Sequence, residues 1–187
     1  MAVGKPVARS GATLGSAVHR ALEIVDLAAV TDQAVEQAVT AACAELGVPR
    51  LTKEVRSRVQ AALAAQIVQL AATRRHWKEV PIVAELGGRI VEGFIDLVVE
   101  TDDGLVVVDY KTDSAGSAAD VQAKAEHYAP QIRAYAEALA LATGLRVAAP
   151  RLLFCQPAGA SPVTVHQAGP AADRGGAPDG SGEGAEG

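Results

Sequence analysis

Apolar residues in the first part of the chain recur every three or four positions, which is the spacing of amphipathic helices. We therefore predict three helices before any strand, at residues 14–30, 32–46 and 52–73. Thr13 is a candidate cap for the first helix, and Thr31 stands immediately before the second. Gly47 and Pro49, residues typical of a helix end, follow the second helix.

The pattern then changes to short runs of alternating apolar and polar residues, which are typical of strands. Three such runs occupy residues 79–86, 89–100 and 105–111. Gly87-Gly88 and the turn sequence 101–104 separate them, so we predict three antiparallel strands joined as a meander. The rest of the prediction is a loop at 113–119, a helix from about 120 in which Pro130 opens the segment ending near Gly144, a strand at 151–155 and an edge strand at 163–165.

The length of 187 residues and this order of elements predict one domain of the α+β class. We expect a mixed sheet that contains the antiparallel meander, with helices on both faces. We assign residues 1–13 to an N-terminal extension, 14–156 to the domain, and 157–187 to a Gly/Pro/Ala-rich tail that we expect to be disordered.

The composition excludes several classes of protein. The net charge is −5 and aromatic residues make up 3%, so a generally basic protein and extensive base stacking are both excluded. Two distant cysteines, Cys43 and Cys155, predict neither a disulfide framework nor a zinc or iron–sulfur cluster. With no apolar run of the ~18 residues that a membrane span needs and no signal peptide, we expect a cytoplasmic protein without a membrane partner.

Two acids and a lysine fall on paired strands of the predicted meander. A four-residue turn at 101–104 places Asp96 directly opposite Asp109, whereas a two-residue Asp-Gly turn would place Asp96 opposite Lys111. Opposed carboxylates among apolar neighbours repel, so they need a cation, a proton or a hydrogen-bond network. We favour a divalent metal ion. The alternative is an ordinary ion pair between Asp109 and Lys111 at a strand end.

His19 is a candidate third ligand. At about 100° per residue it lies roughly 120° from the apolar stripe of its predicted helix, on a polar face that also carries Gly15. The ordinary explanation of such a histidine is a solvated surface residue. Only the two acids make it a candidate for the metal site.

These residues form an ordered series of short motifs, which are Gly15-x-x-x-His19, GFIDLV with Asp96, VVDYKT with Asp109 and Lys111, and Gln131-x-x-x-Tyr135. The series resembles the motifs of RecB-like nucleases of the PD-(D/E)XK superfamily and covers about residues 10–156. The run 76–111 resembles more closely the nuclease module at the C-terminal end of UvrD/AddA-type bacterial helicase–nucleases.

The resemblance implies an α/β/α core like that of restriction endonucleases and a DNA nuclease of repair or recombination, an exonuclease rather than an endonuclease. It implies that Mg²⁺ or Mn²⁺ is held by His19, Asp96, Asp109 and the backbone carbonyl of Tyr110. Asp96, Asp109 and Lys111 are then the catalytic residues, and Lys111 orients or activates the attacking water. Oxygen-rich ligands suit hard divalent ions, which agrees with this assignment.

The resemblance also implies accessory contacts. Gln131 and Tyr135 share a helix face, and Gln131 falls in the first turn after Pro130, where the positive helix end favours a phosphate. They are candidate DNA or active-site contacts; packing of Tyr135 against Tyr128 in the core is the alternative. Glu85 is either an accessory acid of the metal site or an exposed strand residue.

DNA binding needs positive charge near this acidic centre. Residues 50–78 carry seven Lys and Arg residues, including Arg74 and Arg75, against Glu54 alone. This segment is either a phosphate-binding surface or a solvated helix face.

The implied partners are DNA, as single strands or linear ends, and a helicase. The chain lacks the phosphate loop of a helicase motor, so it is a free-standing nuclease, one subunit of a helicase–nuclease, or a fragment of a longer polypeptide. One rival hypothesis is a catalytically silent nuclease-like module that binds DNA or a helicase. Another is an iron–sulfur nuclease of the kind associated with CRISPR adaptation, whose cysteine cluster is missing here.

Overall fold

The computed structural model of the chain describes residues 12–157 and 159–164. Its helices are α1 Ala12–Ile24, α2 Asp32–Glu45, α3 Thr52–Leu63, α4 Gln66–Ala71 and α5 Ala118–Thr143, with short 3₁₀ turns η1 Leu27–Ala29 and η2 Pro49–Leu51. Its strands are β1 His76–Leu86, β2 Arg89–Thr101, β3 Gly104–Lys111, β4 Arg151–Gln156 and β5 Gly159–Thr164. Most of the predicted N-terminal extension, and the chain after residue 164, lie outside the described residues.

One five-stranded sheet forms the centre of the fold, in the strand order β1-β2-β3-β4-β5. β1, β2 and β3 form the predicted antiparallel meander. β4 runs parallel to β3 because α5 returns the chain to the same end of the sheet, and β5 pairs antiparallel with β4. The predicted edge strand thus begins earlier than expected, inside the range 157–187 that we assigned to the tail.

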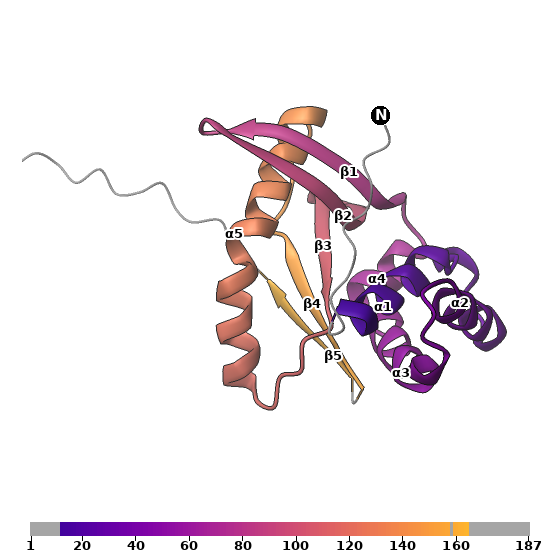
Figure 1. Cartoon of the computed structure of the whole chain (residues 1–187). Coiled ribbons are helices and arrows are strands. Elements are labelled where there is room, and N and C mark those ends of the chain that lie inside the picture. Colours follow the sequence, from indigo (N-terminus) through magenta and orange to yellow (C-terminus); the bar gives the residue numbers. More distant parts are fainter. Residues whose placement is uncertain (1–11, 158, 165–187) are drawn as a thin grey trace, which may run out of the picture.

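Helices cover both faces of this sheet, so the predicted α+β class and α/β/α arrangement are confirmed (Figure 1). On one face, α1 to α4 pack on side chains such as Leu97 and Val108. On the other, α5 covers Val98 and Val107. Among the described residues no helix is long and apolar enough to cross a membrane.

The first helix ends at Ile24, short of the predicted residue 30. Two side chains stop it. Asp26 accepts a hydrogen bond from the backbone N–H of Ala28 and begins the turn η1. Lys78 donates to the carbonyls of Glu23 and Val25, both at 2.6 Å, and so satisfies the open end of the helix. Thr13, the predicted cap, lies within the helix.

The helix predicted at 52–73 is two helices, with Ala65 in an extended conformation between α3 and α4. The stripe that begins at Val55 and Val59 would bring Gln66 inward in a continuous helix. The break leaves Gln66 exposed and buries the next residue, Ile67, instead. The second predicted helix is confirmed, with Thr31 as its cap.

The helix α5 is continuous from Ala118 to Thr143, with Pro130 inside it. Our placement of Pro130 at the start of a helical segment was therefore wrong. Proline lacks the N–H that would bond to the carbonyl four residues earlier, and Pro130 is exposed, so water can satisfy that carbonyl. Gly144 ends the helix in a left-handed conformation with φ 66°.

Candidate active site

Three acids from neighbouring strands fall in one row across the sheet. The pairs Lys78↔Leu97 and Val80↔Ile95 set the register of β1 and β2, and place Glu79 opposite Asp96. The β2–β3 ladder ends at Leu97↔Val108, so Asp109 is the next residue opposite Asp96. The register predicted from the four-residue turn is confirmed, and the alternative pairing of Asp96 with Lys111 is wrong.

The regular alternation of side chains breaks at this row. Ile95 packs beneath α5, whereas Leu97, two residues later, packs beneath α1 to α4. In an undistorted strand these residues would share a face, so the alternation of β2 is interrupted at Asp96, although the register with β1 is the same on both sides of it. On β1, Glu79 has φ 49°, and it is the one non-glycine residue with positive φ in the described part of the chain. Outliers of this kind cluster at functional sites.

The Asp96 carboxylate joins α1 to the sheet. Its Oδ2 accepts the backbone N–H of Tyr110 at 2.7 Å, and its Oδ1 lies 3.0 Å from Nδ1 of His19. The side chain is 11% exposed and that of His19 is 31% exposed. The first helix therefore directs its polar face, with His19, to the row of acids rather than to bulk solvent.

The histidine is charged more readily than usual. Burial alone would lower the pKa of His19, but the charge of Asp96 and the hydrogen bond to it outweigh burial and raise the pKa above its ordinary value. Asp109 and Glu79 act in the same direction. The negative charge of the row thus favours a proton on His19.

Asp109 pairs with Lys111 rather than with His19. Lys111 Nζ lies 2.7 Å from Asp109 Oδ2, and both side chains are largely buried. Burial, and next the charge of Asp96, raise the pKa of Asp109 to about 6, although Lys111 opposes them. The ion pair that we considered as the alternative is therefore present.

At the end of the β2–β3 ladder, the side chains of Asp96 and Asp109 lie toward different helices. By the alternation of β3, Asp109 and Lys111 point to the α5 face with Val107, whereas Asp96 reaches α1. Asp96 thus turns toward His19, while its charge still raises the pKa of Asp109, so the two carboxylates remain neighbours.

A metal ion has one well-defined set of possible ligands among the described residues. Ligand atoms of His19, Glu79 and Asp96 all lie within 4.8 Å of one another. One imidazole and two carboxylates suit a divalent ion that accepts nitrogen and oxygen ligands, such as Mn²⁺ or Mg²⁺. The set fits such an ion, with Asp109 and Lys111 beside it but outside it.

Close packing of α1 on the end of β3 brings His19 to this set. A Cβ atom added at Gly15 would lie 2.9 Å from Oγ1 of Thr112, the residue that follows Lys111. A residue with a Cβ atom at this position would require the Thr112 side chain to rotate or α1 to move away from the sheet. The missing Cβ atom of Gly15 therefore leaves room for the Thr112 side chain beside α1, one turn before His19.

Comparison with known proteins agrees with this geometry. Residues 3–176 match the family model of the PD-(D/E)XK nuclease superfamily. The chain belongs to this superfamily. It is 31% identical over 155 residues to an ATP-dependent helicase/nuclease subunit from Lactiplantibacillus plantarum, covering 71% of this chain and 12% of that protein. The proteins of the same name from two Thermoanaerobacter strains are 38% identical over 76 residues, covering 41% of this chain and 6% of theirs.

Glu79 is the site residue that sequence reasoning missed in this PD-(D/E)XK chain. Glu85, the acid proposed from the same strand, is exposed near the hairpin end opposite Ile90, six residues from Glu79. It is an exposed strand residue, which was the alternative. A signal for Glu79 was present, since counting back from the Gly87-Gly88 turn places Glu79 opposite Asp96.

Gln131 and Tyr135 lie in the middle of α5, so the prediction of a positive helix end beside Gln131 was wrong. Tyr135 is buried in the core under α5, with its hydroxyl against Gly93 and 3.2 Å from Nε2 of Gln131. Tyr128 packs against the same core. The packing alternative describes Tyr135 better than a metal-site contact does.

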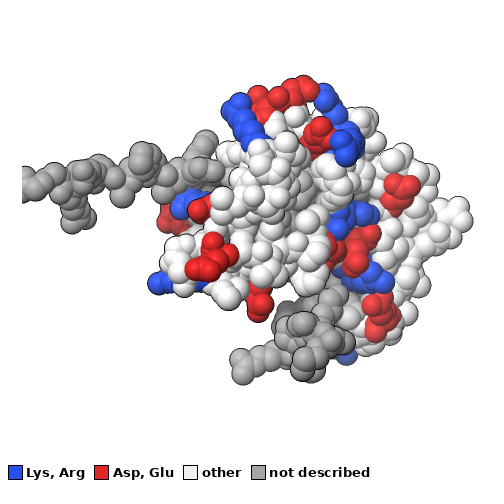
Figure 2. Space-filling model, turned by 90° about the horizontal axis from the view of Figure 1, so that it is seen from above, with Lys and Arg blue, Asp and Glu red and all other residues white. Residues whose placement is uncertain are grey.

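The basic segment is not one continuous surface. Arg74 binds both carboxylate oxygens of Asp102, and Arg75 lies 3.6 Å from Glu100 and over the ring of Trp77. The other pairs are Arg56 with Glu36, buried Arg58 with Glu54, and Lys78 with the carbonyls at the end of α1. Figure 2 shows basic and acidic side chains interspersed over the face that it presents. The prediction of a phosphate-binding surface over 50–78 is not supported.

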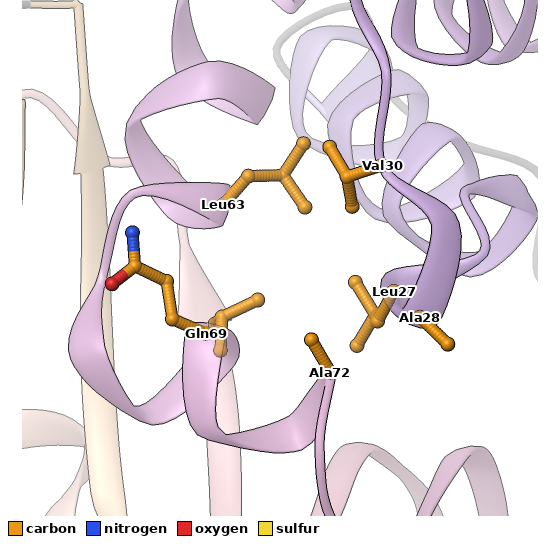
Figure 3. Close-up of a pocket in the computed structure, with 7 residues that line it drawn as sticks. Leu27, Ala28, Val30, Leu63, Gln69 and Ala72 are labelled. Carbon is orange, nitrogen blue, oxygen red and sulfur yellow. The ribbon is translucent and has the colours of Figure 1, made fainter.

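An apolar hollow lies beside the break between α3 and α4. Leu27, Val30 and Leu63 are among the residues that line it, with Gln69 as a polar side chain at its wall (Figure 3). None of the three acids of the row lines it. We attribute the hollow to the helix break and not to the chemistry of the site.

Proposed function

We propose that this chain is a divalent-metal-dependent deoxyribonuclease that hydrolyses DNA phosphodiester bonds. The observation that carries the proposal is the row of Glu79, Asp96 and Asp109, with His19 and Lys111 on its two sides, in a chain of the PD-(D/E)XK nuclease superfamily. PD-(D/E)XK nucleases generally use divalent metals. We propose Mg²⁺ or Mn²⁺ as the ion.

His19, Glu79 and Asp96 are the residues that we propose to hold the ion, with Asp109 and the carbonyl of Tyr110 as further candidate ligands. When bound, a divalent ion lowers the pKa of bound water and offsets charge that develops on a phosphodiester. Glu79 and Asp96 are both missing from the regular β1–β2 pairs, and Glu79 has a positive φ, so the two acids lie where the ladder is irregular.

Lys111 has the second role in the proposal. Its ammonium is a compact positive charge, held against Asp109 in a poorly solvated place. There it can orient the attacking water or stabilise a phosphate oxygen in the transition state. Asp109 keeps this side chain near the row of acids and stabilises its charge.

The relatives suggest the setting. The chain spans 6% to 12% of the length of the helicase/nuclease subunits that it matches. We propose that it works with a helicase, as a partner or as part of the same polypeptide, in cytoplasmic DNA repair or recombination. Linear DNA ends or single strands, such as a helicase would supply, are the proposed substrates, and an exonuclease fits them better than an endonuclease does. The alternative of a silent module is disfavoured by the intact set of Asp96, Asp109 and Lys111.

Degradation of linear single-stranded and double-stranded DNA tests the proposal. We expect cleavage by the wild type in Mg²⁺ or Mn²⁺, no cleavage in EDTA, and a loss of at least about 100-fold in Asp109→Ala and Lys111→Ala. Cleavage without metal, or full activity in both variants, would refute the enzyme.

Calorimetric titration with Mg²⁺ tests the ligands separately. We expect His19→Ala to weaken binding by about tenfold or more, because it removes one of three ligands. Unchanged affinity would remove His19 from the metal site and leave the nuclease proposal to be decided by the cleavage assay.

A further inference from the structure

The ammonium group of Lys111 contacts the ring of Tyr128 as well as the carboxylate of Asp109. The lysine Nζ lies 4.2 Å from the centroid of the Tyr128 ring and 2.7 Å from Asp109 Oδ2. The negative face of an aromatic ring attracts an ammonium group, most strongly where both are poorly solvated. The lysine side chain is 15% exposed, so this condition is met.

The hydroxyl of Tyr128 also binds a second carboxylate, which could compete with Asp109 for Lys111. Asp113 stands two residues after Lys111, and its Oδ2 accepts the hydroxyl of Tyr128 at 3.0 Å. Gln156 binds the backbone carbonyl of Asp113 and fixes this loop to the end of β4. The ring of Tyr128 therefore attracts Lys111, while its hydroxyl binds the second carboxylate that could draw Lys111 away from Asp109.

From this arrangement we propose that Tyr128 is the positioning residue for Lys111. The inference rests on the proposed function, in which Lys111 acts on the water or the phosphate. A lysine side chain has four rotatable carbon–carbon bonds, and an ammonium displaced by about 1 Å can cost up to about 100-fold in rate. The contacts of Tyr128 and Asp109 with Nζ together restrict the positions that the lysine ammonium can take.

The first test observes the lysine directly in metal-free protein. In a sample with ¹³C-labelled lysine, the ε-methylene protons of Lys111 are assigned with the Lys111→Arg variant, since the chain has five lysines. A ring 4.2 Å from Nζ shifts these protons upfield. We expect the shift in the wild type and in Tyr128→Phe, and its loss in Tyr128→Leu.

The second test measures cleavage of linear DNA at saturating Mg²⁺. We expect Tyr128→Leu to lower kcat by about tenfold or more, and Tyr128→Phe, which keeps the ring, to stay within about threefold of the wild type. DNA affinity is expected to change less than threefold in either. His127→Leu is the matched control. It removes the neighbouring ring in α5, and that ring packs on Tyr128 and not on Lys111.

The outcomes separate this inference from the proposed function. An inactive wild type would overturn the proposed nuclease. An active wild type with Tyr128→Leu within about twofold in kcat, or with Lys111 protons unaffected by that substitution, would overturn the role of Tyr128 alone. If Tyr128→Leu does not fold, the wild-type spectrum still decides, since Lys111 protons at the position of exposed Lys53 would refute the contact.

Discussion

Glu79 gives the sharpest test of the site, because its backbone and its carboxylate predict opposite effects. At φ 49° an L-residue with a Cβ atom is strained by about 1 to 2 kcal/mol. Glycine relieves this strain. It also loses more conformational freedom on folding than alanine does, which costs roughly 0.5 to 1 kcal/mol. Glu79→Gly should therefore be more stable than Glu79→Ala by about 0.5 to 1 kcal/mol.

Urea unfolding of the two metal-free variants measures this difference. For a chain of this size it corresponds to about 1 to 4 °C in Tm. The matched pair is Glu85→Gly and Glu85→Ala on the same strand. Glu85 has ordinary φ, so the order should reverse there and the glycine variant should be the less stable one.

Both substitutions at Glu79 remove the carboxylate, so both should weaken Mg²⁺ binding by about tenfold or more in calorimetry. Substitutions at Glu85 should leave the affinity unchanged. The reasoning is refuted if alanine at position 79 is as stable as glycine, or if Mg²⁺ binds both Glu79 variants as tightly as the wild type.

Three further predictions concern the groups around the row. The raised pKa of Asp109, about 6, means that the folded chain binds a proton between about pH 4 and 6 that the unfolded chain does not. Metal-free stability should therefore fall as pH rises through this window, by on the order of 3 kcal/mol. Asp109→Asn should remove that fall in urea titrations at several pH values, and an unchanged slope would contradict the assignment. Gly15→Ala should reduce Mg²⁺ affinity by displacing α1, and adding Thr112→Ala should restore the affinity. If the double variant binds Mg²⁺ as weakly as Gly15→Ala does, the contact between positions 15 and 112 is contradicted. Arg58 is buried and donates to the carbonyls of Thr112 and Cys155, so Arg58→Met should destabilise the chain by about 2 to 4 kcal/mol in urea unfolding, whereas a change below about 0.5 kcal/mol would show that these carbonyls find other donors.

Turn chemistry and two-residue periodicity predicted the meander and its register. The turn after β2 contains Asp102 and Asp103 between the paired residues Thr101 and Gly104, and this local information fixes which residues of β2 and β3 face each other. The same local information at Gly87-Gly88 would have predicted Glu79 opposite Asp96. The sequence therefore contained the information that places Glu79 at the site, and our prediction did not use it.

Other features depend on contacts between distant segments. Asp96 turns toward His19 because α1 lies on that face, and no alternation rule along β2 predicts this interruption. The pair between Arg74 and Asp102 joins residues 28 apart, so a count of charges along 50–78 could not reveal that the segment is largely neutralised. Likewise, only the exposed position of Pro130 shows why α5 continues through it.

Cleavage of linear DNA by Asp96→Asn, measured over a range of Mg²⁺ concentrations beside Asp102→Asn, tests the central claim most directly. Asp96 bonds to His19 and to the backbone of Tyr110, whereas Asp102 lies exposed in the turn after β2, so only the first substitution changes the row of acids. The account predicts metal-dependent cleavage by the wild type and by Asp102→Asn, and a loss of about 100-fold or more in Asp96→Asn. Equal rates for Asp96→Asn and the wild type, or cleavage that persists in EDTA, would contradict it.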